Sequence, residues 1–445
     1  MPNDKFHILT FGCQMNVNDS DWLEQALIKR NLEPTTEVSA NIIIINTCSV
    51  REKPEQKVIQ TIKHISATKN NPRTIIVIIG CVAQQLGTDL FKHSPKVRLI
   101  AGTDCLANVP NSIIKLIQNP ELKISLLDFT NSYTEKEIID HKKSNPISYV
   151  NIMQGCDNFC TYCIVPFTRG RQKSRDVDAI LNECTINVKN GAKEICLLGQ
   201  NVNAFGLDRA DSISFANLIR EISKIKGLKR IRYVTPHPKD MTDEDIALFS
   251  EIPILCPRLH LPIQSGSNNI LKRMNRRYTR EIFIDLVNKL KSTKPDIALS
   301  TDLIVGFPNE SDSDFNDTLE IMKTCQFMSS FSFCYSDRPG TKATLLPDKI
   351  SKEIQLQRLQ ILQTLQENLS SSWLNNRINK NSLVLIEKKS IKNAYPDTNS
   401  WQGHDEYGCI IHVHFKDDLD YTGQIIPVKI IEAKKHSLVG IPKDN

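Results

Sequence analysis

Residues 155–163 read G-C-D-N-F-C-T-Y-C and place Cys156, Cys160 and Cys163 in a C-x3-C-x2-C triad. Three thiolates this close together on one loop can bind three irons of a cubane cluster and leave the fourth iron open to a small molecule. A zinc site normally offers four ligands, often as paired C-x2-C units, whereas the next cysteine here, Cys184, falls in a predicted helix. The triad therefore favours an iron–sulfur cluster with an open position.

The triad directly follows the first of six predicted strands that alternate with helical segments such as 178–189 and 280–293. The strands are expected at residues 149–153, 194–198, 229–234, 257–261, 298–305 and 328–334. Six β/α repeats indicate a partial (β/α)6 TIM-like barrel, and such barrels place their chemistry at the carboxyl ends of the strands. The triad is expected at that end.

The first 130 residues alternate between strands and helices in the same way. Strands are expected at residues 6–11, 42–45, 74–79 and 97–100, and Asn18, Asp19 or Ser20 is expected to cap the first helix. This alternation predicts a doubly wound parallel sheet with helices on both faces.

Three further cysteines follow strands of that sheet. Cys13, Cys48 and Cys81 each lie within about three residues of a predicted strand end. The carboxyl ends of such strands share one edge, where ligands bind, so the three thiols are expected to converge. The alternative is three buried structural cysteines, because free cysteine is often a small core residue.

The rest of the chain completes four segments. Residues 131–147 are polar, contain a proline and are interpreted as a linker between a domain at 1–130 and the barrel domain at 148–375, which ends in a long helix from residue 352. Residues 376–445 are expected to form a small all-β barrel, with strands at 382–387, 409–415, 423–433 and 437–441. Small barrels of this kind often bind single-stranded nucleic acid.

Composition limits the compartment and the cysteine chemistry. The first residues show no signal peptide, and no apolar run approaches the roughly 18–20 residues of a membrane span, so we expect a cytoplasmic protein without membrane contact. Thirteen cysteines in such a protein indicate metal binding or redox chemistry rather than disulfides.

The net charge of +6 is unevenly distributed. Two stretches without acidic residues carry the basic side chains Arg169, Arg171, Lys173 and Arg175, and Lys272, Arg273, Arg276, Arg277 and Arg280. Such patches suit contacts with nucleic-acid phosphates, and the alternative is a solvated surface.

Eight runs resemble the radical S-adenosylmethionine methylthiotransferase family that modifies tRNA. They are TFGCQMNVNDS (10–20), NTCSVREK (46–53), GCVAQ (80–84), QGCDNFCTYCIVPFTRGR (154–171), LLGQNVNAFG (197–206), HLPIQSGSNNILKRMNR (260–276), TDLIVGFPNE (301–310) and SDRPGTKA (336–343). They occur in the order of the family and cover essentially the whole chain, and the C-terminal segment resembles the RNA-binding TRAM barrel.

The resemblance implies two [4Fe–4S] clusters. The cluster at Cys156, Cys160 and Cys163 would bind S-adenosylmethionine and cleave it to a radical that abstracts hydrogen from C2 of adenine. A second cluster at Cys13, Cys48 and Cys81 would present the sulfur, and a second S-adenosylmethionine would supply the methyl group. The cofactors carry the difficult chemistry, and the protein orients and shields it.

The resemblance also implies contacts and partners. Candidate S-adenosylmethionine contacts are Gln200, Asn201, Gln264, Ser265, Gly306, Phe307 and Pro308. His237 and His260 lie near barrel strand ends and are interpreted mainly as structural. The best candidates for tRNA phosphate contact are Arg169, Arg171, Lys173 and Arg175, just beyond the cysteine loop. We expect a monomer that depends on an external electron donor and sulfur source.

The expected reaction is methylthiolation of C2 of N6-isopentenyladenosine at position 37 of the tRNA anticodon loop, because G-C-Q-M-N at residues 12–16 resembles that branch of the family. One alternative is the same reaction on threonylcarbamoyladenosine or a ribosomal-protein aspartate, and another is a non-catalytic iron–sulfur RNA-binding protein. The chain departs from the family pattern at Gln172, Lys173, Asn309 and Ser311 and in residues 402–408.

Overall fold

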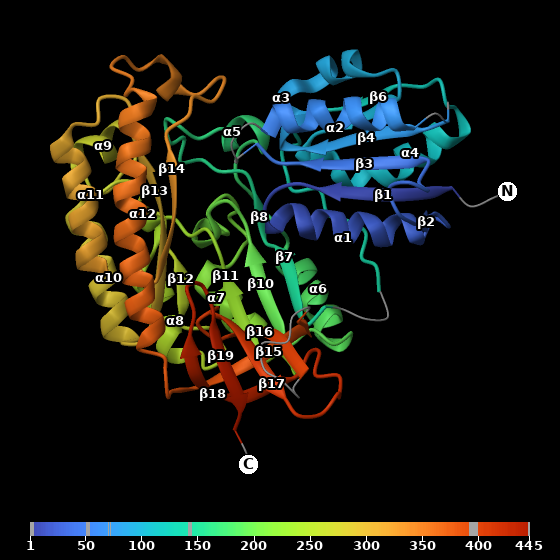
Figure 1. Cartoon of the computed structure of the whole chain (residues 1–445). Helices are drawn as coiled ribbons and strands as arrows, with labels where there is room; N and C mark the ends of the chain where they lie inside the picture. The colour runs from blue at the N-terminus through green and yellow to red at the C-terminus, as the bar shows by residue number, and fades with distance from the viewer. Residues whose placement is uncertain are drawn as a thin grey trace.

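Three β-rich regions follow one another along the chain, and the central one contains two sheets (Figure 1). They are a six-stranded parallel sheet, two three-stranded parallel sheets and a closed five-stranded barrel. The computed structural model describes residues 4–49, 54–69, 71, 73–140, 145–390 and 399–443. No helix in these ranges is both long and apolar enough to cross a membrane.

The N-terminal sheet has the strand order β2-β1-β3-β4-β5-β6, and all of its neighbouring strands are parallel. Its strands are β1 (Lys5–Thr10), β2 (Glu33–Pro34), β3 (Ile42–Thr47), β4 (Ile75–Gly80), β5 (Val97–Ala101) and β6 (Ile124–Leu126). The helical segments are α1 (Gln14–Ile28), α2 (Pro54–Thr68), α3 (Cys81–Leu86), η1 (Gly87–His93), η2 (Thr103–Asn108) and α4 (Val109–Gln118).

Alternation along β3 distributes the core to both faces of this sheet. Ile44 packs with residues of α1 and α4, such as Leu27 and Ile113, while Ile45 packs with residues of α2 and α3, such as Ile62. Helices therefore cover both faces, which confirms the predicted doubly wound sheet.

The predicted start of the first helix was wrong. Helix α1 begins at Gln14, directly after Cys13, so Asn18, Asp19 and Ser20 lie inside it rather than at its N-cap. Ser20 is buried, and its hydroxyl accepts a hydrogen bond from Thr10 (2.8 Å), which places it at the helix–sheet contact.

The central region is a partial barrel built from the sheets β11-β10-β7 and β12-β13-β14. An isolated bridge joins Ile231 of β11 to Leu255, which precedes β12. The strands are β7 (Ile147–Asn151), β10 (Glu194–Leu198), β11 (Arg230–Tyr233), β12 (Arg258–His260), β13 (Ala298–Val305) and β14 (Ser329–Cys334). The first predicted strand is divided into β7 and β8 (Met153–Gln154), and β8 pairs with β9 (Lys173–Ser174).

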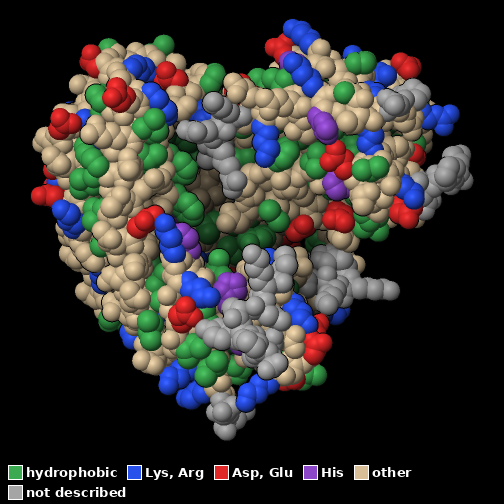
Figure 2. All heavy atoms as spheres, in the orientation of Figure 1, with side chains coloured by type: hydrophobic (Ala, Val, Ile, Leu, Met, Phe, Trp, Pro, Cys, Tyr) green, Lys and Arg blue, Asp and Glu red, His purple; other side chains and the backbone are tan. Residues whose placement is uncertain are grey.

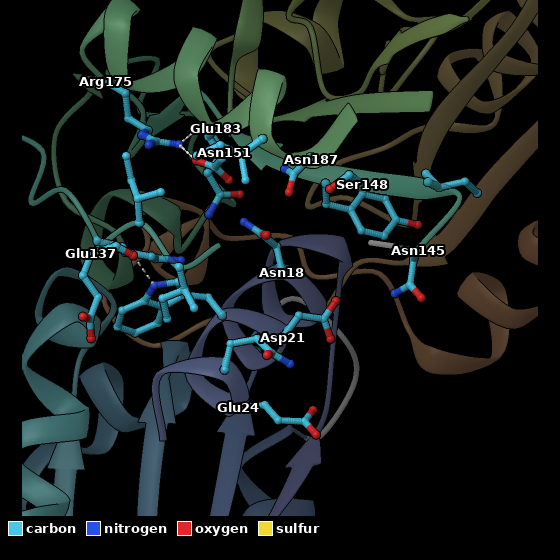
Figure 3. A pocket seen from close by; sticks show the side chains of 18 of the residues that line it. Asn18, Asp21, Glu24, Glu137, Asn145, Ser148, Asn151, Arg175, Glu183 and Asn187 are labelled. Atoms are coloured by element: carbon cyan, nitrogen blue, oxygen red, sulfur yellow. Dashed lines mark hydrogen bonds and ion pairs between the residues drawn. The ribbon is translucent and has the colours of Figure 1, made fainter. Parts of the chain in front are cut away.

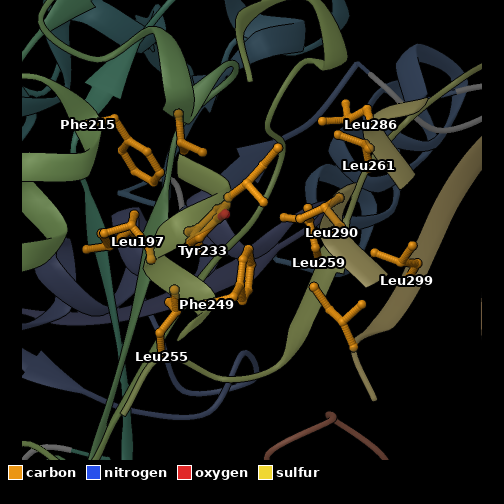
Figure 4. Close-up of a cluster of buried hydrophobic side chains, with 14 of the residues drawn as sticks. Leu197, Phe215, Tyr233, Phe249, Leu255, Leu259, Leu261, Leu286, Leu290 and Leu299 are labelled. Carbon is orange, nitrogen blue, oxygen red and sulfur yellow. The ribbon is translucent and has the colours of Figure 1, made fainter. Parts of the chain in front are cut away.

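Helices cover the outside of this barrel (Figure 1). They are α6 (Val177–Lys189), α7 (Phe215–Ser223), α8 (Asp243–Glu251), α10 (Arg280–Thr293), α11 (Asp312–Cys325) and α12 (Lys352–Asn375). The connections also contain the shorter helical segments α5 (Val165–Thr168), η3 (Val202–Ala204), η4 (Pro238–Asp240), α9 (Asn268–Arg273) and η5 (Lys342–Leu345). Leu197, Tyr233, Leu259 and Leu299 from four strands meet Phe215, Phe249 and Leu290 from the helices in one buried cluster (Figure 4). The six-strand prediction is thus confirmed.

The C-terminal barrel closes in the order β15-β16-β17-β19-β18. Its strands are β15 (Asn381–Lys389), β16 (Asn399–Asp405), β17 (Ile410–Phe415), β18 (Ile425–Ala433) and β19 (Leu438–Pro442). The barrel lies against the amino-terminal ends of β10 and β11, where His404 Nε2 lies 3.0 Å from Glu194 Oε2 and Arg230 Nη1 donates to the His404 carbonyl (3.1 Å). It therefore joins the central barrel at the end opposite the cysteine loop.

Candidate active site

Cys13, Cys48 and Cys81 meet at one edge of the N-terminal sheet, as predicted from their strand ends. Cys13 follows β1, Cys48 follows β3, and Cys81 is the first residue of α3 after β4. The order in which strands are added to the sheet reverses between β1 and β3, which makes this edge the topological switch point where open α/β sheets bind ligands. A Cβ on Gly12 would lie 2.4 Å from Cys48 Cβ, so the close approach of the two cysteine-bearing segments requires glycine there.

Asparagine and threonine side chains hold this edge together. Cys13 Sγ lies 3.3 Å from Asn16 Oδ1, and Asn16 Nδ2 donates to Asn46 Oδ1 (2.7 Å) on the neighbouring strand. Thr47 Oγ1 accepts hydrogen bonds from the amides of Val82 (3.1 Å) and Ala83 (3.3 Å), which fixes the start of α3. These supporting residues were not predicted, although Asn16 and Asn46 both lie within the family runs.

The environment of Cys13 favours a thiolate. A hydrogen bond from Cys48 lowers the pKa of Cys13 to about 5 against the opposing effect of burial, and the nearby Arg169 guanidinium contributes to the lowering. A thiolate is the form that binds iron.

Cys156, Cys160 and Cys163 lie on the loop that follows β8. Other segments of the central barrel hold this loop in place: Thr161 N–H donates to the Met274 carbonyl (3.0 Å) and Asn275 Nδ2 to the Phe159 carbonyl (3.0 Å). Burial, followed by the neighbouring Cys160, raises the pKa of Cys163 to about 12, and burial also raises the pKa of Cys156. The thiol of Cys160 thus affects the pKa of both other thiols of the triad, as expected for ligands of one cluster.

Gln200 connects the two cysteine sites. Its Oε1 accepts a hydrogen bond from the Gly155 amide (2.6 Å), next to Cys156, while its Nε2 lies 2.6 Å from Sδ of Met15, two residues after Cys13. Met15 in turn packs on Cys196 and Leu198 of β10. The predicted cofactor contact Gln200 therefore lies at the contact between the N-terminal sheet and the barrel.

The donors at both sites fit cubane clusters. Each site supplies three thiols, and within the described residues no three His, Cys, Asp or Glu side chains are close enough to hold a single metal ion. A cubane spreads three thiolates over three irons, so its ligands need not converge on one point. The central site also has unsatisfied polar atoms for a ligand: Asn201 Oδ1 and His237 Nε2 are buried and have no hydrogen-bond partner in the described part of the chain.

His237 is neutral at this site. Burial, followed by the nearby Arg276 and Lys239, lowers the pKa of His237 to about 2. Its Nδ1 accepts a hydrogen bond from the Lys239 amide (3.2 Å), so Nε2 carries the proton and is available as a donor.

The other predicted S-adenosylmethionine contacts have different surroundings. Ser265 and Phe307 are fully buried; Ser265 Oγ accepts from the Ser267 amide (3.2 Å), and Phe307 packs edge-to-face on Tyr335. Gln264 and Gly306 have positive φ, and Pro308 is buried beside Gly306. His260 Nδ1 lies 3.0 Å from Ser300 Oγ. These residues line the same strand ends, and their contact with the cofactor stays a prediction.

Three of the four predicted phosphate contacts have partners inside the protein. Lys173 forms an ion pair with Asp104, and Arg175 pairs with Glu135 and Glu183. Arg169 is also buried, beside Cys13 and Cys81. This corrects their assignment to tRNA, because buried cations are not available to phosphates. Arg171 is different: its side chain is 73% exposed and pairs with Asp157.

The second basic patch is only partly exposed. Arg276 is buried with Nη1 3.6 Å from Cys160 Sγ, and Arg280 pairs with Asp317 (2.8 Å), whereas Lys272 and Arg277 are exposed. The sequence around this patch contains no acidic residues, and the partners of Arg276 and Arg280 lie far away along the chain. The sequence alone therefore did not reveal them.

The departures from the family pattern are accommodated locally. Asn309 adopts φ of 65°, a conformation that asparagine tolerates better than most residues other than glycine. Ser311 caps α11 in a capping box with Asp314. Gln172 Nε2 donates to the Ala204 carbonyl (2.6 Å) and to Asp208 (3.2 Å), and His404 in the altered segment 402–408 bonds Glu194.

Two depressions lie near the contact between sheet and barrel. Figure 2 shows the face of the molecule hollowed between the N-terminal sheet, the central barrel and the C-terminal barrel. A separate cavity of about 290 Å³ lies between α1, the segment after β6 and α6, where Arg175 reaches Glu183 and the Asn151 carbonyl (Figure 3). None of the six cysteines lines this cavity.

Comparisons with known proteins agree with the geometry. Residues 150–322 match the radical SAM superfamily and residues 5–102 match uncharacterized protein family UPF0004. A tRNA-2-methylthio-N(6)-dimethylallyladenosine synthase of Lawsonia intracellularis is 51% identical, with 98% of each chain covered. Proteins of the same name from Nitratidesulfovibrio vulgaris (49% identical, covering 99% of this chain and 98% of the relative) and Clostridium botulinum (41%, covering 98% and 96%) also match.

A solved structure shares the fold. The radical S-adenosylmethionine methyltransferase TsrM from Kitasatospora setae, solved with cobalamin and a [4Fe-4S] cluster bound, superposes with a TM-score of 0.58 at 12% identity. The match covers 77% of this chain and 74% of that protein.

Proposed function

Because the chain belongs to the tRNA-2-methylthio-N(6)-dimethylallyladenosine synthase family of radical S-adenosylmethionine methylthiotransferases, we propose that it methylthiolates C2 of N6-isopentenyladenosine at position 37 of the tRNA anticodon loop. The observation that carries the proposal is the pair of cysteine triads at the carboxyl ends of two adjoining sheets, linked through Gln200 and Arg169. We propose that the adenine is held between them and faces both sites.

Membership of the superfamily implies one [4Fe–4S] cluster and S-adenosylmethionine. We propose Cys156, Cys160 and Cys163 as ligands of that cluster, and Cys13, Cys48 and Cys81 as ligands of a second. When bound, the first cluster supplies the electron that cleaves S-adenosylmethionine, and the second presents the sulfur.

The side chains of the protein position these groups. Gln200 fixes the amide before Cys156, and Met15 closes the contact between α1 and β10. Asn201 Oδ1 and the protonated Nε2 of His237 are free to bind polar atoms of S-adenosylmethionine, together with Gln264, Ser265 and residues 306–308.

The remaining partners are also proposals. We assign Arg171 and the C-terminal barrel to tRNA contacts, because Arg171 is exposed beside the cysteine loop and small β-barrels commonly bind unpaired RNA. An anticodon-loop adenine is already unpaired and can be turned into the site at modest energy. We further propose a cytoplasmic monomer supplied by an external electron donor and sulfur source.

Mass spectrometry of tRNA nucleosides from a strain that lacks the gene tests the substrate. The 2-methylthio group should disappear from N6-isopentenyladenosine and return when the wild-type gene is supplied. Normal 2-methylthio-N6-isopentenyladenosine, with loss of the group from threonylcarbamoyladenosine, would instead assign the alternative substrate.

A further inference from the structure

Each cysteine triad has one buried arginine directed at it. Arg276 is 6% exposed, and its Nη1 lies 3.6 Å from Sγ of Cys160. Arg169 is 5% exposed, and its guanidinium interacts electrostatically with Cys81 and Cys13. Both arginines come from the basic stretches that the sequence suggested for RNA.

Neither arginine has a carboxylate within 4 Å in the described part of the chain. The other guanidinium nitrogens of Arg276 donate to neutral oxygens: Nε to Tyr278 Oη (2.8 Å) and Nη2 to the Pro262 carbonyl. The Asp19 carboxylate interacts electrostatically with Arg169 at longer range, but it forms its ion pair with Lys136 (2.6 Å). A buried cation without an anion is strongly unfavourable, so each site calls for negative charge near its arginine.

The thiols are the groups that can supply this charge. Once the cysteines bind iron as thiolates, their negative charge compensates the positive charge of the buried guanidinium groups. Hydrogen bonds to the sulfurs and the net local charge are two of the factors that set the reduction potential of an iron–sulfur cluster.

We propose that Arg276 and Arg169 are positioning residues that act through Cys160 and Cys81 to raise the reduction potentials of the two clusters. The inference rests on the two clusters of the proposed function. Reduction of either cluster takes one electron from the reductant and adds one negative charge, and a buried guanidinium stabilises that added charge.

Arg169 has a further consequence, because it belongs to the central barrel but serves the N-terminal site. It follows α5, six residues after Cys163, and the Thr168 carbonyl accepts a hydrogen bond from Thr103 Oγ1 (2.8 Å) of the N-terminal region. The reduction potential of the cluster at Cys13, Cys48 and Cys81 therefore depends on contact between the central barrel and the N-terminal sheet.

The test uses two full-length parent proteins, each with one triad replaced. Cys13, Cys48 and Cys81 are changed to Ala in one, and Cys156, Cys160 and Cys163 in the other. Arg276→Gln, Arg169→Gln and the corresponding Lys variants are made in both parents. Anaerobic titration with dithionite, followed by electron paramagnetic resonance, gives the midpoint potential of the single remaining cluster, and iron content is measured on the same samples.

Arg276→Gln should shift the potential of the Cys156 cluster to a more negative value and leave the other cluster unchanged, and Arg169→Gln should do the reverse. The Lys variants, which keep the charge, should retain most of the wild-type potential. Lys224→Gln is the control, because its exposed side chain beside α7 lies on the outside of the barrel and should affect neither cluster.

Unchanged potentials in iron-loaded Gln variants would overturn the inference. If a Gln variant binds no iron, the Lys variant decides: iron binding near the parent potential supports the inference, and failure to bind iron assigns a structural role and overturns it. Failure of the proposed function is distinct, because the parent that retains only Cys13, Cys48 and Cys81 would then bind no cluster before any arginine is changed.

Discussion

Lys173 and Asp104 form an ion pair between the central barrel and the N-terminal region, and their side chains are 6% and 2% exposed. Gln154 also donates to Asp104, so the carboxylate is surrounded by donors from the barrel. Removing one partner of a buried pair leaves the other charge without compensation, which is more harmful than replacing both.

We therefore expect Lys173→Gln to lower the free energy of unfolding by about 3–5 kcal/mol. Urea denaturation followed by circular dichroism measures the change. Arg171→Gln removes an exposed pair two residues away and should leave the free energy of unfolding nearly unchanged. Equal effects of the two substitutions would show that the buried pair has no special role.

Glu194 predicts a dependence of stability on pH. Burial raises its pKa, but Arg232, His404 and Arg230 outweigh this effect and lower the pKa of Glu194 from 4.5 to about 2. Since the folded pKa is below the unfolded one, the ionised carboxylate stabilises the fold above about pH 4.5, and this contribution is lost as the pH falls toward 2.

The stability advantage of wild type over Glu194→Gln should therefore be largest at pH 6 and should shrink as the pH falls below about 4.5. Thermal denaturation across this range measures it. Glu121→Gln, at a side chain that is 94% exposed, serves as the control and should differ little from wild type at any pH. A Glu194 difference that stays constant down to pH 2.5 would refute the assignment.

At the scale of elements, the turn from β8 into the cysteine loop depends on Gly155. Its φ is 79°, and a Cβ there would lie 2.0 Å from the Arg171 carbonyl oxygen, a backbone atom that cannot move aside. The Gly155 amide also donates a hydrogen bond to Gln200 Oε1. The position of the whole loop therefore follows from this residue.

Gly155→Ala should displace the loop and lower the iron content of reconstituted protein by about four irons per chain, which corresponds to one cubane. Gly340→Ala is a matched control, because Gly340 has a similar φ of 81° but no atom within 4 Å of an added Cβ. Full iron loading of Gly155→Ala would mean that the loop tolerates the change.

The elements themselves were largely predictable. Strands such as β3 and β4 are continuous isoleucine and valine runs, and a parallel sheet buried on both faces requires such runs. Strand β16 was missed because its sequence, NSWQGHD, is polar and contains glycine, and it is stabilised by pairing with β15 and β17 rather than by local preference.

For the whole molecule, the sequence identified the six cysteines because their spacing and strand-end positions are local features. It could not identify the ion pairs of Lys173 and Arg175, since each depends on a partner distant in sequence, Asp104 or Glu135. The same limitation hid Arg276 beside Cys160, 116 residues away.

Arg171 is the exposed cation of the first stretch, and it tests the proposed tRNA surface. Arg171→Gln should weaken tRNA binding and reduce the slope of log affinity against log salt by about 1, because one phosphate contact is lost. Filter binding at several salt concentrations measures the slope. Lys224→Gln, at an exposed residue beside α7 on the outside of the barrel, should leave it unchanged.

The division of labour between the two triads is most directly tested by comparing Cys156→Ala with Cys48→Ala. Each protein is incubated anaerobically with S-adenosylmethionine, reductant and isopentenylated tRNA, and mass spectrometry quantifies 5′-deoxyadenosine and the methylthiolated nucleoside. Cys156→Ala should abolish both products, whereas Cys48→Ala should retain some 5′-deoxyadenosine and form no methylthiolated nucleoside. Identical losses in the two variants would contradict separate roles for the two sites.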